Sequence, residues 1–266
     1  MKYSNVQLAR NYLSYYRRAS NSQGHGMHSP FVFDFIQNVL NNRKGYEPPA
    51  KMERLRKELL ADRTILEIDD LGAGSRSVTS RRRSVAQLAR TALKPKKYAH
   101  LLYRLVRHYQ PRTIIELGTS LGLTTAYLAA GNPAAELHTV EGSVAIAERA
   151  RRNLTELGTM QVHQHVGHFD ELLPSLLKQV SSPDLVYIDG NHRLQPTLDY
   201  FLQCRNAAHN NTILVFDDIH WSPEMERAWE EIRQHPDVRY TIDIFFLGFV
   251  FFRPEFKVKQ DFIIRF

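Results

Sequence analysis

The sequence predicts an α/β fold built on a doubly wound, mostly parallel sheet, and three observations lead to this prediction. From residue 113 onward, short apolar runs alternate with helical patterns, as they do in βα units. The runs at 185–189 and 213–218 are continuously apolar up to their terminal acids, which is typical of central strands covered on both faces. Two aromatic-rich runs, 240–246 and 249–252, flank Gly248 and predict an antiparallel terminal hairpin.

The stretch 113–122 is the centre of this arrangement. Its apolar strand ends in Glu116, turns through Gly118 and Gly122, and leads into a helix over 124–130. Glycine lets the backbone approach a ligand closely, and the first amides of a helix point at what binds there. The dinucleotide fingerprint Gly-x-Gly-x-x-Gly is absent. The candidate cofactor-binding residues of this turn are Glu116, Gly118, Thr119, Ser120, Gly122 and Thr124.

Further acids are predicted at the carboxyl ends of the following strands, where ligands of open α/β sheets bind. The strand 137–141 ends in Glu141, which could accept both hydroxyls of a ribose. The edge strand 162–166 precedes a loop in which Phe169 could lie against an adenine ring. Because the chain offers no pyrophosphate cradle and no P-loop lysine, an adenosine ligand with a cationic, phosphate-free tail fits best. The remaining candidates for cofactor binding are Glu141, Gly142, His168, Phe169, Asp189 and Gly190.

Length and composition set the broad class. The 266 residues suit one large domain or a domain with an extension, and we expect a helical extension over 1–84 and the catalytic domain over 85–266. The single cysteine, Cys204, excludes an internal disulfide and a cysteine metal cage, and it reads as core filler. The N-terminus lacks a signal-peptide pattern, and no apolar run is long enough for a bilayer. A cytoplasmic protein without membrane contact is expected.

Charge is divided unevenly along the chain. Residues 1–112 hold 22 Lys/Arg against 8 Asp/Glu, a net of +14, whereas residues 113–266 hold 13 against 20, a net of −7. The basic half is either a partner face or a solvated helical surface. Its aromatic helices could serve as a lid or a homodimer contact. The segment 64–75 resembles a second cofactor loop, but no strand ending in an acid follows at the required distance, and the basic stretch 76–83 reads as a turn.

Several motifs together resemble the class I S-adenosylmethionine-dependent methyltransferases, and most closely the catechol and caffeoyl-CoA type O-methyltransferases. The resemblance covers about residues 85–266. The residues that carry it are Glu116-Leu-Gly-Thr-Ser-Leu-Gly122, Glu141, the stretch 166–174, Ile188-Asp-Gly190 and Phe216-Asp-Asp-Ile-His-Trp221. The resemblance implies a Rossmann-like seven-stranded sheet of order 3-2-1-4-5-7-6 with the last strand antiparallel, and S-adenosylmethionine as cofactor.

The same resemblance implies one Mg²⁺ or another divalent cation that activates the acceptor hydroxyl. Asp189 and Asp217 match two of its ligands, and Asp218 stands where the family has Asn. His192 occupies the position of the family's lysine base and is a competent general base, and His220 is a second candidate. We expect Asp189 to share in catalysis through the metal. The acids could instead cap helices or turns only.

The expected activity is methyl transfer to a hydroxyl oxygen of a small-molecule acceptor. Methylation of tRNA or rRNA remains an alternative because of the basic front half, although no RNA-binding module is recognised. A cofactor-binding protein without transfer activity is a third possibility. The pair His163 and His165 has metal-like spacing but lacks a third ligand in the sequence, and both are expected at the surface.

Overall fold

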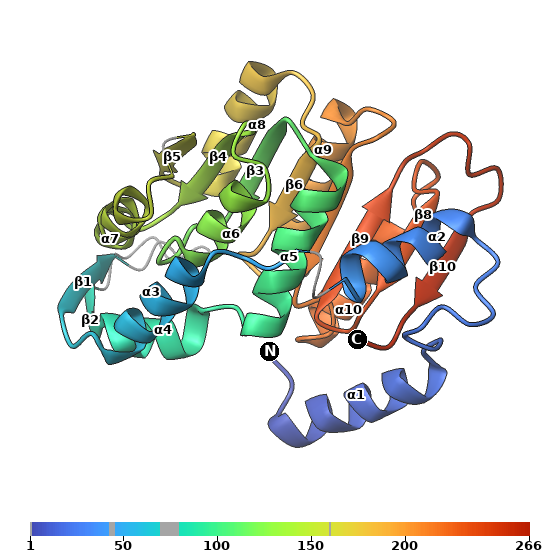
Figure 1. Ribbon diagram of the computed structural model, residues 1–266, viewed down its shortest axis with the longest axis horizontal. Helices are drawn as coiled ribbons and strands as arrows, with labels where there is room; N and C mark the ends of the chain where they lie inside the picture. The colour runs from blue at the N-terminus through green and yellow to red at the C-terminus, as the bar shows by residue number, and fades with distance from the viewer. Residues whose placement is uncertain (1, 43–45, 70–79, 160) are drawn as a thin grey trace. The chain divides into compact units, whose positions relative to one another are not determined.

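The computed structural model describes residues 2–42, 46–69, 80–159 and 161–266 (Figure 1). The chain folds into two compact units, which we call the central unit (residues 38–172) and the terminal unit (residues 1–37 and 173–266). The predicted N-terminal extension is thus divided between the two units. The boundary that we predicted after residue 84 falls inside the central unit and stays a prediction about function.

The central unit is built around three parallel strands in the order β3-β4-β5. Strand β3 is buried along most of its length and pairs with β4, whose other edge pairs with the more exposed β5. The order and the edge position of β5 confirm the prediction for this half of the sheet. The strands and the helices that follow them are β3 (Thr113–Leu117), α6 (Leu123–Gly131), β4 (Glu136–Glu141), α7 (Val144–Glu156), β5 (Val162–Val166) and α8 (Phe169–Val180), the last of which continues into the terminal unit.

The part of the central unit that precedes β3 packs onto α6 and α7. Its helices α3, α4 and α5 share one hydrophobic core with α6 and α7, in which Met52, Leu88 and Tyr127 are buried. Helix α5 lies so close to α6 that a Cβ on Gly131 would stand 2.6 Å from Cβ of Val106. The elements of this part are α3 (Ala50–Ala61), β1 (Ile65–Asp69), β2 (Ser80–Ser84), α4 (Val85–Ala92) and α5 (Lys96–Tyr109).

Strands β1 and β2 form an antiparallel hairpin in which Glu67 is paired with Arg82 (Figure 1). The prediction of a turn over 76–83 is therefore wrong for residues 80–83, which are extended and paired with β1 in a ladder where Glu67 lies opposite Arg82. Gly72 and Gly74 of the possible second cofactor loop lie outside the described residues. The hairpin agrees with our rejection of a cofactor loop there, since β1 is not followed by a parallel strand within it.

The terminal unit carries the strand order β6-β7-β9-β8-β10. Strands β6 and β7 are parallel, β9 runs antiparallel between β7 and β8, and β10 adds parallel to β8. The first four strands confirm the predicted 4-5-7-6 half, and β10 was not predicted. The elements are β6 (Leu185–Ile188), α9 (Leu194–Ala207), β7 (Ile213–Asp217), α10 (Pro223–Gln234), β8 (Tyr240–Asp243), β9 (Leu247–Phe251) and β10 (Gln260–Ile263).

The first 37 residues pack on this part of the sheet through aromatic side chains. Helix α1 places Tyr12 edge-on to Phe245, with ring centroids 5.0 Å apart. Phe35 packs against Phe249 and Phe251 of β9. Ser29 caps the second helix, which changes into a π-helix after Phe35. These elements are α1 (Asn5–Arg18), α2 (Pro30–Phe35) and the π-helix η1 (Ile36–Leu40), which ends in the central unit.

The described residues also bear on the predictions for Cys204 and for membrane-spanning helices. Cys204 is fully buried in α9, as expected of core filler. Among the described residues, no helix is both long and apolar enough to span a bilayer.

Candidate active site

The glycine turn of the central unit joins the end of β3 to the start of α6. Gly118 and Gly122 have φ values of 112° and 78°, in the region that favours glycine. The amides of Gly118 and Thr119 donate to the carbonyl of Val140 at 3.0 and 3.1 Å, so the turn is fixed to strand β4. Helix α6 has no side-chain cap at its N-terminus. Its first amides therefore form a site for a polar or anionic group.

Glu116 lies beneath this turn and is fully buried. Its Oε2 accepts hydrogen bonds from the hydroxyls of Thr125 at 2.5 Å and Thr139 at 2.7 Å. The hydroxyls of Thr119 and Thr139 lie 2.6 Å apart. The structure thus gives Glu116 the task of holding α6 and β4 to the turn, and direct contact with a cofactor stays a prediction for Glu116, Thr119 and Thr124.

Glu141 stands at the carboxyl end of β4 and connects two loops. Its Oε2 accepts from the amide of Ser120 at 2.9 Å, and its Oε1 accepts from the amide of Ser143 at 3.0 Å. Burial raises the pKa of Glu141, and the backbone amides of Ser143, Ser120 and Gly142 oppose that shift. Because a carboxylate has about four acceptor positions, both oxygens retain capacity for ligand hydroxyls.

The loop after β5 lies beside Glu141. Val166 is the register partner of Glu141, and the amide of Gly167 donates to the carbonyl of Glu141 at 3.0 Å. Phe169 begins α8 and is half-buried, whereas His168 is exposed. The structure therefore brings Ser120, Glu141 and the loop 167–169 to one edge of the central unit, as the sequence predicted for a bound adenosine.

In the terminal unit, the ends of β6 and β7 bring together Asp189, His192 and Asp217. One oxygen or nitrogen from each of these side chains lies within 4.8 Å of the other two. Asp217 is only 1% exposed. The Oδ2 of Asp189 accepts from the hydroxyl of Tyr187 at 2.8 Å, and Nε2 of His192 stands 3.7 Å from Oδ1 of Asp189. Two carboxylates and an imidazole could hold a divalent cation.

This group contains two of the three predicted metal ligands. Asp218 adopts φ 53°, and its backbone bonds to Phe246 and Trp221, with the amide 2.7 Å from the Phe246 carbonyl. Its carboxylate is outside the converging group, and His192 takes the third position. Gly190 follows Asp189 directly and precedes Asn191, which has φ 57°. The roles of Asp218 and Gly190 stay predictions.

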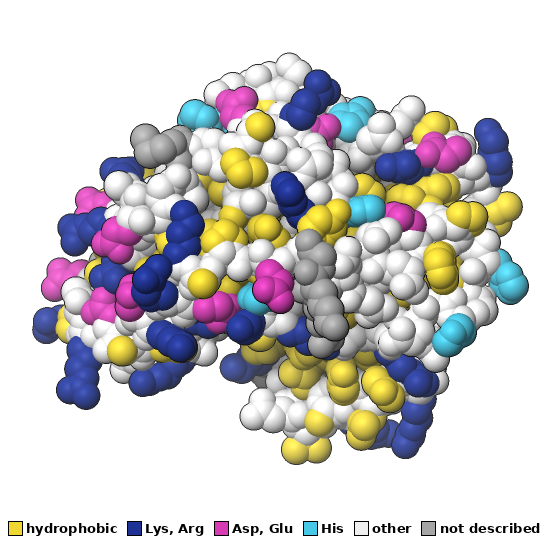
Figure 2. Space-filling view, in the orientation of Figure 1, with side chains coloured by type: hydrophobic (Ala, Val, Ile, Leu, Met, Phe, Trp, Pro, Cys, Tyr) yellow, Lys and Arg dark blue, Asp and Glu magenta, His cyan; other side chains and the backbone are white. Residues whose placement is uncertain are grey.

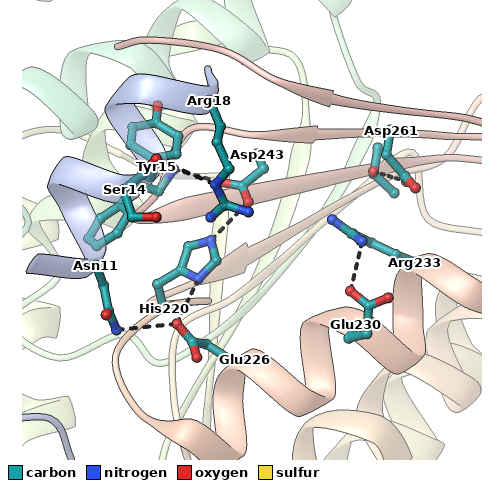
Figure 3. Close-up of polar contacts among 12 residues, drawn as sticks. Asn11, Ser14, Tyr15, Arg18, His220, Glu226, Glu230, Arg233, Asp243 and Asp261 are labelled. Carbon is teal, nitrogen blue, oxygen red and sulfur yellow. Dashed lines mark hydrogen bonds and ion pairs between the residues drawn. The ribbon is translucent and has the colours of Figure 1, made fainter. Parts of the chain in front are cut away.

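His220 is held between two carboxylates (Figure 3). Its Nε2 lies 2.8 Å from Oδ2 of Asp243, its Nδ1 lies 3.3 Å from Oε1 of Glu226, and its ring stacks on Phe245. Burial acts to lower the pKa of His220, but the hydrogen bonds and negative charges of Asp243 and Glu226 outweigh it and raise the pKa to about 9. A protonated ring has no lone pair for a substrate proton, so His192 is the better candidate base.

Helix α1 and the residues before it extend this network in a way that the sequence did not reveal. The Tyr3 hydroxyl donates to Oε2 of Glu226 at 2.7 Å. The Asn11 amide reaches Oε1 of Glu226 at 3.5 Å (Figure 3). The Tyr3 amide also donates to the carbonyl of Trp221. These partners are more than 200 residues apart in the chain, and no local pattern indicates such contacts.

Comparison with known proteins matches the part of the chain that contains these candidate sites. Residues 115–219 match the model of a family described as a methyltransferase domain, and they include the glycine turn, Glu141 and the group at Asp189. This part of the chain matches a methyltransferase domain. The predicted recognition is thereby confirmed at the level of the domain. No curated protein matches the chain.

Solved structures share the fold at low sequence identity. An O-methyltransferase from Bacillus cereus, in complex with SAH, is 20% identical over 83% of this chain and 97% of that chain, with a TM-score of 0.55. A methyltransferase from Podospora anserina, bound to SAH, is 13% identical over 85% and 97%, with a TM-score of 0.60. The O-methyltransferase TomG from Streptomyces achromogenes, in complex with SAM, is 23% identical over 60% and 82%, with a TM-score of 0.54. The Rossmann-like methyltransferase fold is confirmed.

Proposed function

We propose that this chain transfers a methyl group from S-adenosylmethionine to a hydroxyl oxygen of a small acceptor. The proposal depends on two groups of residues that lie within the part of the chain that matches a methyltransferase domain. This part contains a glycine turn hydrogen-bonded to a strand-end glutamate, and a separate group of two aspartates and a histidine. The first set suits an adenosine with a cationic tail, and the second suits a hydroxyl that must lose a proton. Bound SAM or SAH in the similar structures supports the choice of donor.

In the central unit, the chain's own groups would hold the donor. Glu141 would accept the ribose hydroxyls while its oxygens keep their bonds to Ser120 and Ser143. Phe169 would cover the adenine, and the amides at the start of α6 would bind the donor's carboxylate. S-adenosylmethionine supplies a sulfonium methyl: an oxygen–carbon bond forms as the carbon–sulfur bond breaks, and the electron pair stays on sulfur. Holding donor and acceptor in line is the main contribution of the protein.

In the terminal unit, the donor set at Asp189 fits a divalent cation. Two converging carboxylates repel each other unless a cation or a proton lies between them, and the buried Asp217 strengthens this repulsion. When bound, a divalent ion acts as a Lewis acid that lowers the pKa of an acceptor hydroxyl. Asp189, Asp217 and His192 would hold it, and Tyr187 would fix the orientation of Asp189. An imidazole nitrogen in the set favours Mn²⁺ or another transition metal over Mg²⁺.

His192 has two possible tasks, which an experiment separates. As a base it would take the acceptor's proton, and as a ligand it would hold the metal. A His192→Gln variant that binds Mn²⁺ as tightly as the native protein, but whose rate rises steadily with pH and approaches the native rate under alkaline conditions, identifies a base. A variant that loses Mn²⁺ binding identifies a ligand.

The test of the proposed function is turnover. We expect methylation of catechol-type hydroxyls with S-adenosylmethionine, a loss of rate in chelator, and recovery when Mn²⁺ is added back. S-adenosylhomocysteine binding without turnover on any hydroxyl acceptor would instead favour a cofactor-binding protein. Failure to bind S-adenosylhomocysteine would overturn the donor assignment.

An RNA acceptor is the second candidate, because exposed basic side chains gather on one surface of the central unit. Figure 2 shows Lys and Arg, with Asp and Glu among them, over the region of the β1–β2 hairpin and its neighbouring helices. Phosphate contacts would make RNA binding fall steeply with salt, by about one power of salt concentration per contact. Salt-dependent methylation of RNA, with none on small hydroxyls, would favour this acceptor. The exposed basic residues of this region include Lys51, Arg54, Lys57, Arg63, Arg82, Arg83 and Arg90.

A further inference from the structure

A polar relay in the central unit begins at Asp62, directly after helix α3. The Oδ2 of Asp62 lies 2.6 Å from Nη1 of Arg149 on α7, and the two side chains are 19% and 21% exposed. The Oδ1 of Asp62 accepts from the amide of Thr64 at 2.8 Å, and its carbonyl accepts from the amide of Ala86. Asp62 is therefore held from both sides, and it fixes the guanidinium of Arg149 in one direction.

The relay continues along α7 to Asn153, one helical turn further on. The Nε of Arg149 donates to Oδ1 of Asn153 at 3.1 Å. The Nδ2 of Asn153 donates to the carbonyl of Leu121 at 2.8 Å, and Asn153 is 1% exposed. Because an arginine can only donate and a carbonyl can only accept, the two partners leave the amide of Asn153 a single orientation.

Leu121 lies within the glycine turn, so the relay ends on the turn itself. The next residue, Gly122, packs against the same helix: a Cβ at this position would stand 3.3 Å from Cβ of Ala150 and 3.2 Å from Cγ of Leu154. Ser120, on the other side of Leu121, has φ 47°, and its amide donates a hydrogen bond to Glu141. A shift of Leu121 therefore changes the position of Ser120 and, through it, the carboxylate that would bind the ribose.

We propose that Asp62, Arg149 and Asn153 are positioning residues that set the affinity of the glycine turn for its cofactor. The inference rests on the proposed binding of S-adenosylmethionine at this turn. It gives the N-terminal segment of the central unit an indirect part in cofactor binding, since Asp62 lies between α3 and the β1–β2 hairpin. None of the three side chains needs to touch the cofactor for this effect.

The primary experiment is calorimetric titration of S-adenosylhomocysteine into full-length variants. Asn153→Asp keeps the bond from Arg149 but replaces the donor to Leu121 with an acceptor, and Arg149→Met and Asp62→Asn break the two earlier steps. We expect about 10-fold weaker binding for Asn153→Asp and about five-fold for the other two, from the loss of one to two hydrogen bonds. Arg152→Met, an exposed arginine on the same helix, is the matched control and should bind like the native protein.

A second measurement separates positioning from general stability. Arg149→Met and Asn153→Ala are measured singly and together. The double variant should lose less affinity for S-adenosylhomocysteine than the sum of the two single losses, because removing the Asn153 side chain already disconnects Arg149 from the turn. In turnover assays, KM for S-adenosylmethionine should rise while KM for the acceptor stays constant. A merely structural role would lower the melting temperature without this selective change.

Three outcomes would overturn the relay: native affinity in folded variants, equal loss in Arg152→Met, or fully additive effects. The affinity of a Glu141→Ala variant for S-adenosylhomocysteine distinguishes a wrong relay from a wrong assignment of the cofactor site. If Glu141→Ala weakens binding but the relay variants do not, only the relay is wrong. If Glu141→Ala also binds like the native protein, the cofactor does not occupy this turn.

Discussion

The glycine turn of the central unit and the acidic strand ends of the terminal unit differ in how their carboxylates are partnered. In the central unit, Glu141 and Glu116 are already bonded to backbone amides and threonine hydroxyls. In the terminal unit, Asp189 and Asp217 converge with His192, so negative charge is concentrated rather than dispersed. The first region is organised by the chain itself. In the second, under the proposed function, a divalent cation would neutralise that charge, so this region should be the one that depends on solution conditions.

The largest expected effect tests the acidic region. Asp217→Ala removes a buried carboxylate of the proposed metal site while Asp189 and His192 remain, and we expect kcat to fall by about 10²- to 10⁴-fold because Lewis-acid activation is worth several kcal/mol. S-adenosylhomocysteine affinity should stay native, as measured by calorimetry. Full activity of this variant in chelator would remove the metal from the account.

The next effect tests how far the glycine turn is fixed in advance. Gly122→Ala places a side chain against Ala150 and Leu154 at φ 78°, and we expect the free energy of unfolding to fall by about 2–4 kcal/mol in urea titrations. Gly158→Ala is the matched control, because its φ is 67° but nothing lies within 4 Å of the added Cβ. It should lose only the backbone term of about 1–2 kcal/mol. Equal losses would mean that contact with α7 does not constrain the turn.

A smaller effect is expected at Glu141. Replacing it with alanine leaves the amides of Ser120 and Ser143 without their carboxylate, and S-adenosylhomocysteine should bind about 10- to 100-fold more weakly, as for a lost hydrogen bond to a charged group. Mn²⁺ binding should not change. A variant that lost metal binding but kept cofactor affinity would reverse the roles assigned to the two regions.

The smallest effect is a pH dependence of stability that arises from histidines on β4 and β5 of the central unit. Burial lowers the pKa of His138, reinforced by His163 and opposed by Glu136, and burial with the neighbouring histidines also lowers the pKa of His165. Since the unfolded histidines titrate near 6.5, stability should be complete above that pH and should fall as the pH drops below it. Urea unfolding at pH 7.5 and 5.5 measures this change. A His138→Phe variant should lose less stability over that interval, and an unchanged difference would exclude His138 as its source.

The sequence predicted the features that local patterns encode. Continuous apolar runs located β6 and β7, and the glycine spacing located the turn before α6. The register of parallel strands then placed Glu141 beside Gly167, and Asp189 near Asp217, as expected.

Other features escaped prediction for physical reasons. Strand β2 consists of serines and arginines with weak strand propensity, and its extended form goes with its pairing to β1, which the local pattern does not encode. Strand β10 is largely exposed and shows no strong alternation. The contacts of Asp62 with Arg149 and of Asn11 with Glu226 join residues far apart in sequence, so only the folded chain reveals them. His192 entered the predicted site as a base, and its place within the ligand group follows from the geometry after β6.

The most direct test of the whole account is calorimetric titration of S-adenosylhomocysteine into the native protein and Asp217→Ala, each with Mn²⁺ and with chelator. We expect the same affinity in all four titrations, together with a loss of methyl transfer in chelator and in the variant. This result would establish a cofactor region that the chain organises alone and a separate region that depends on its acids. Absence of binding to the native protein in both buffers, or binding that disappears with Asp217, would contradict it.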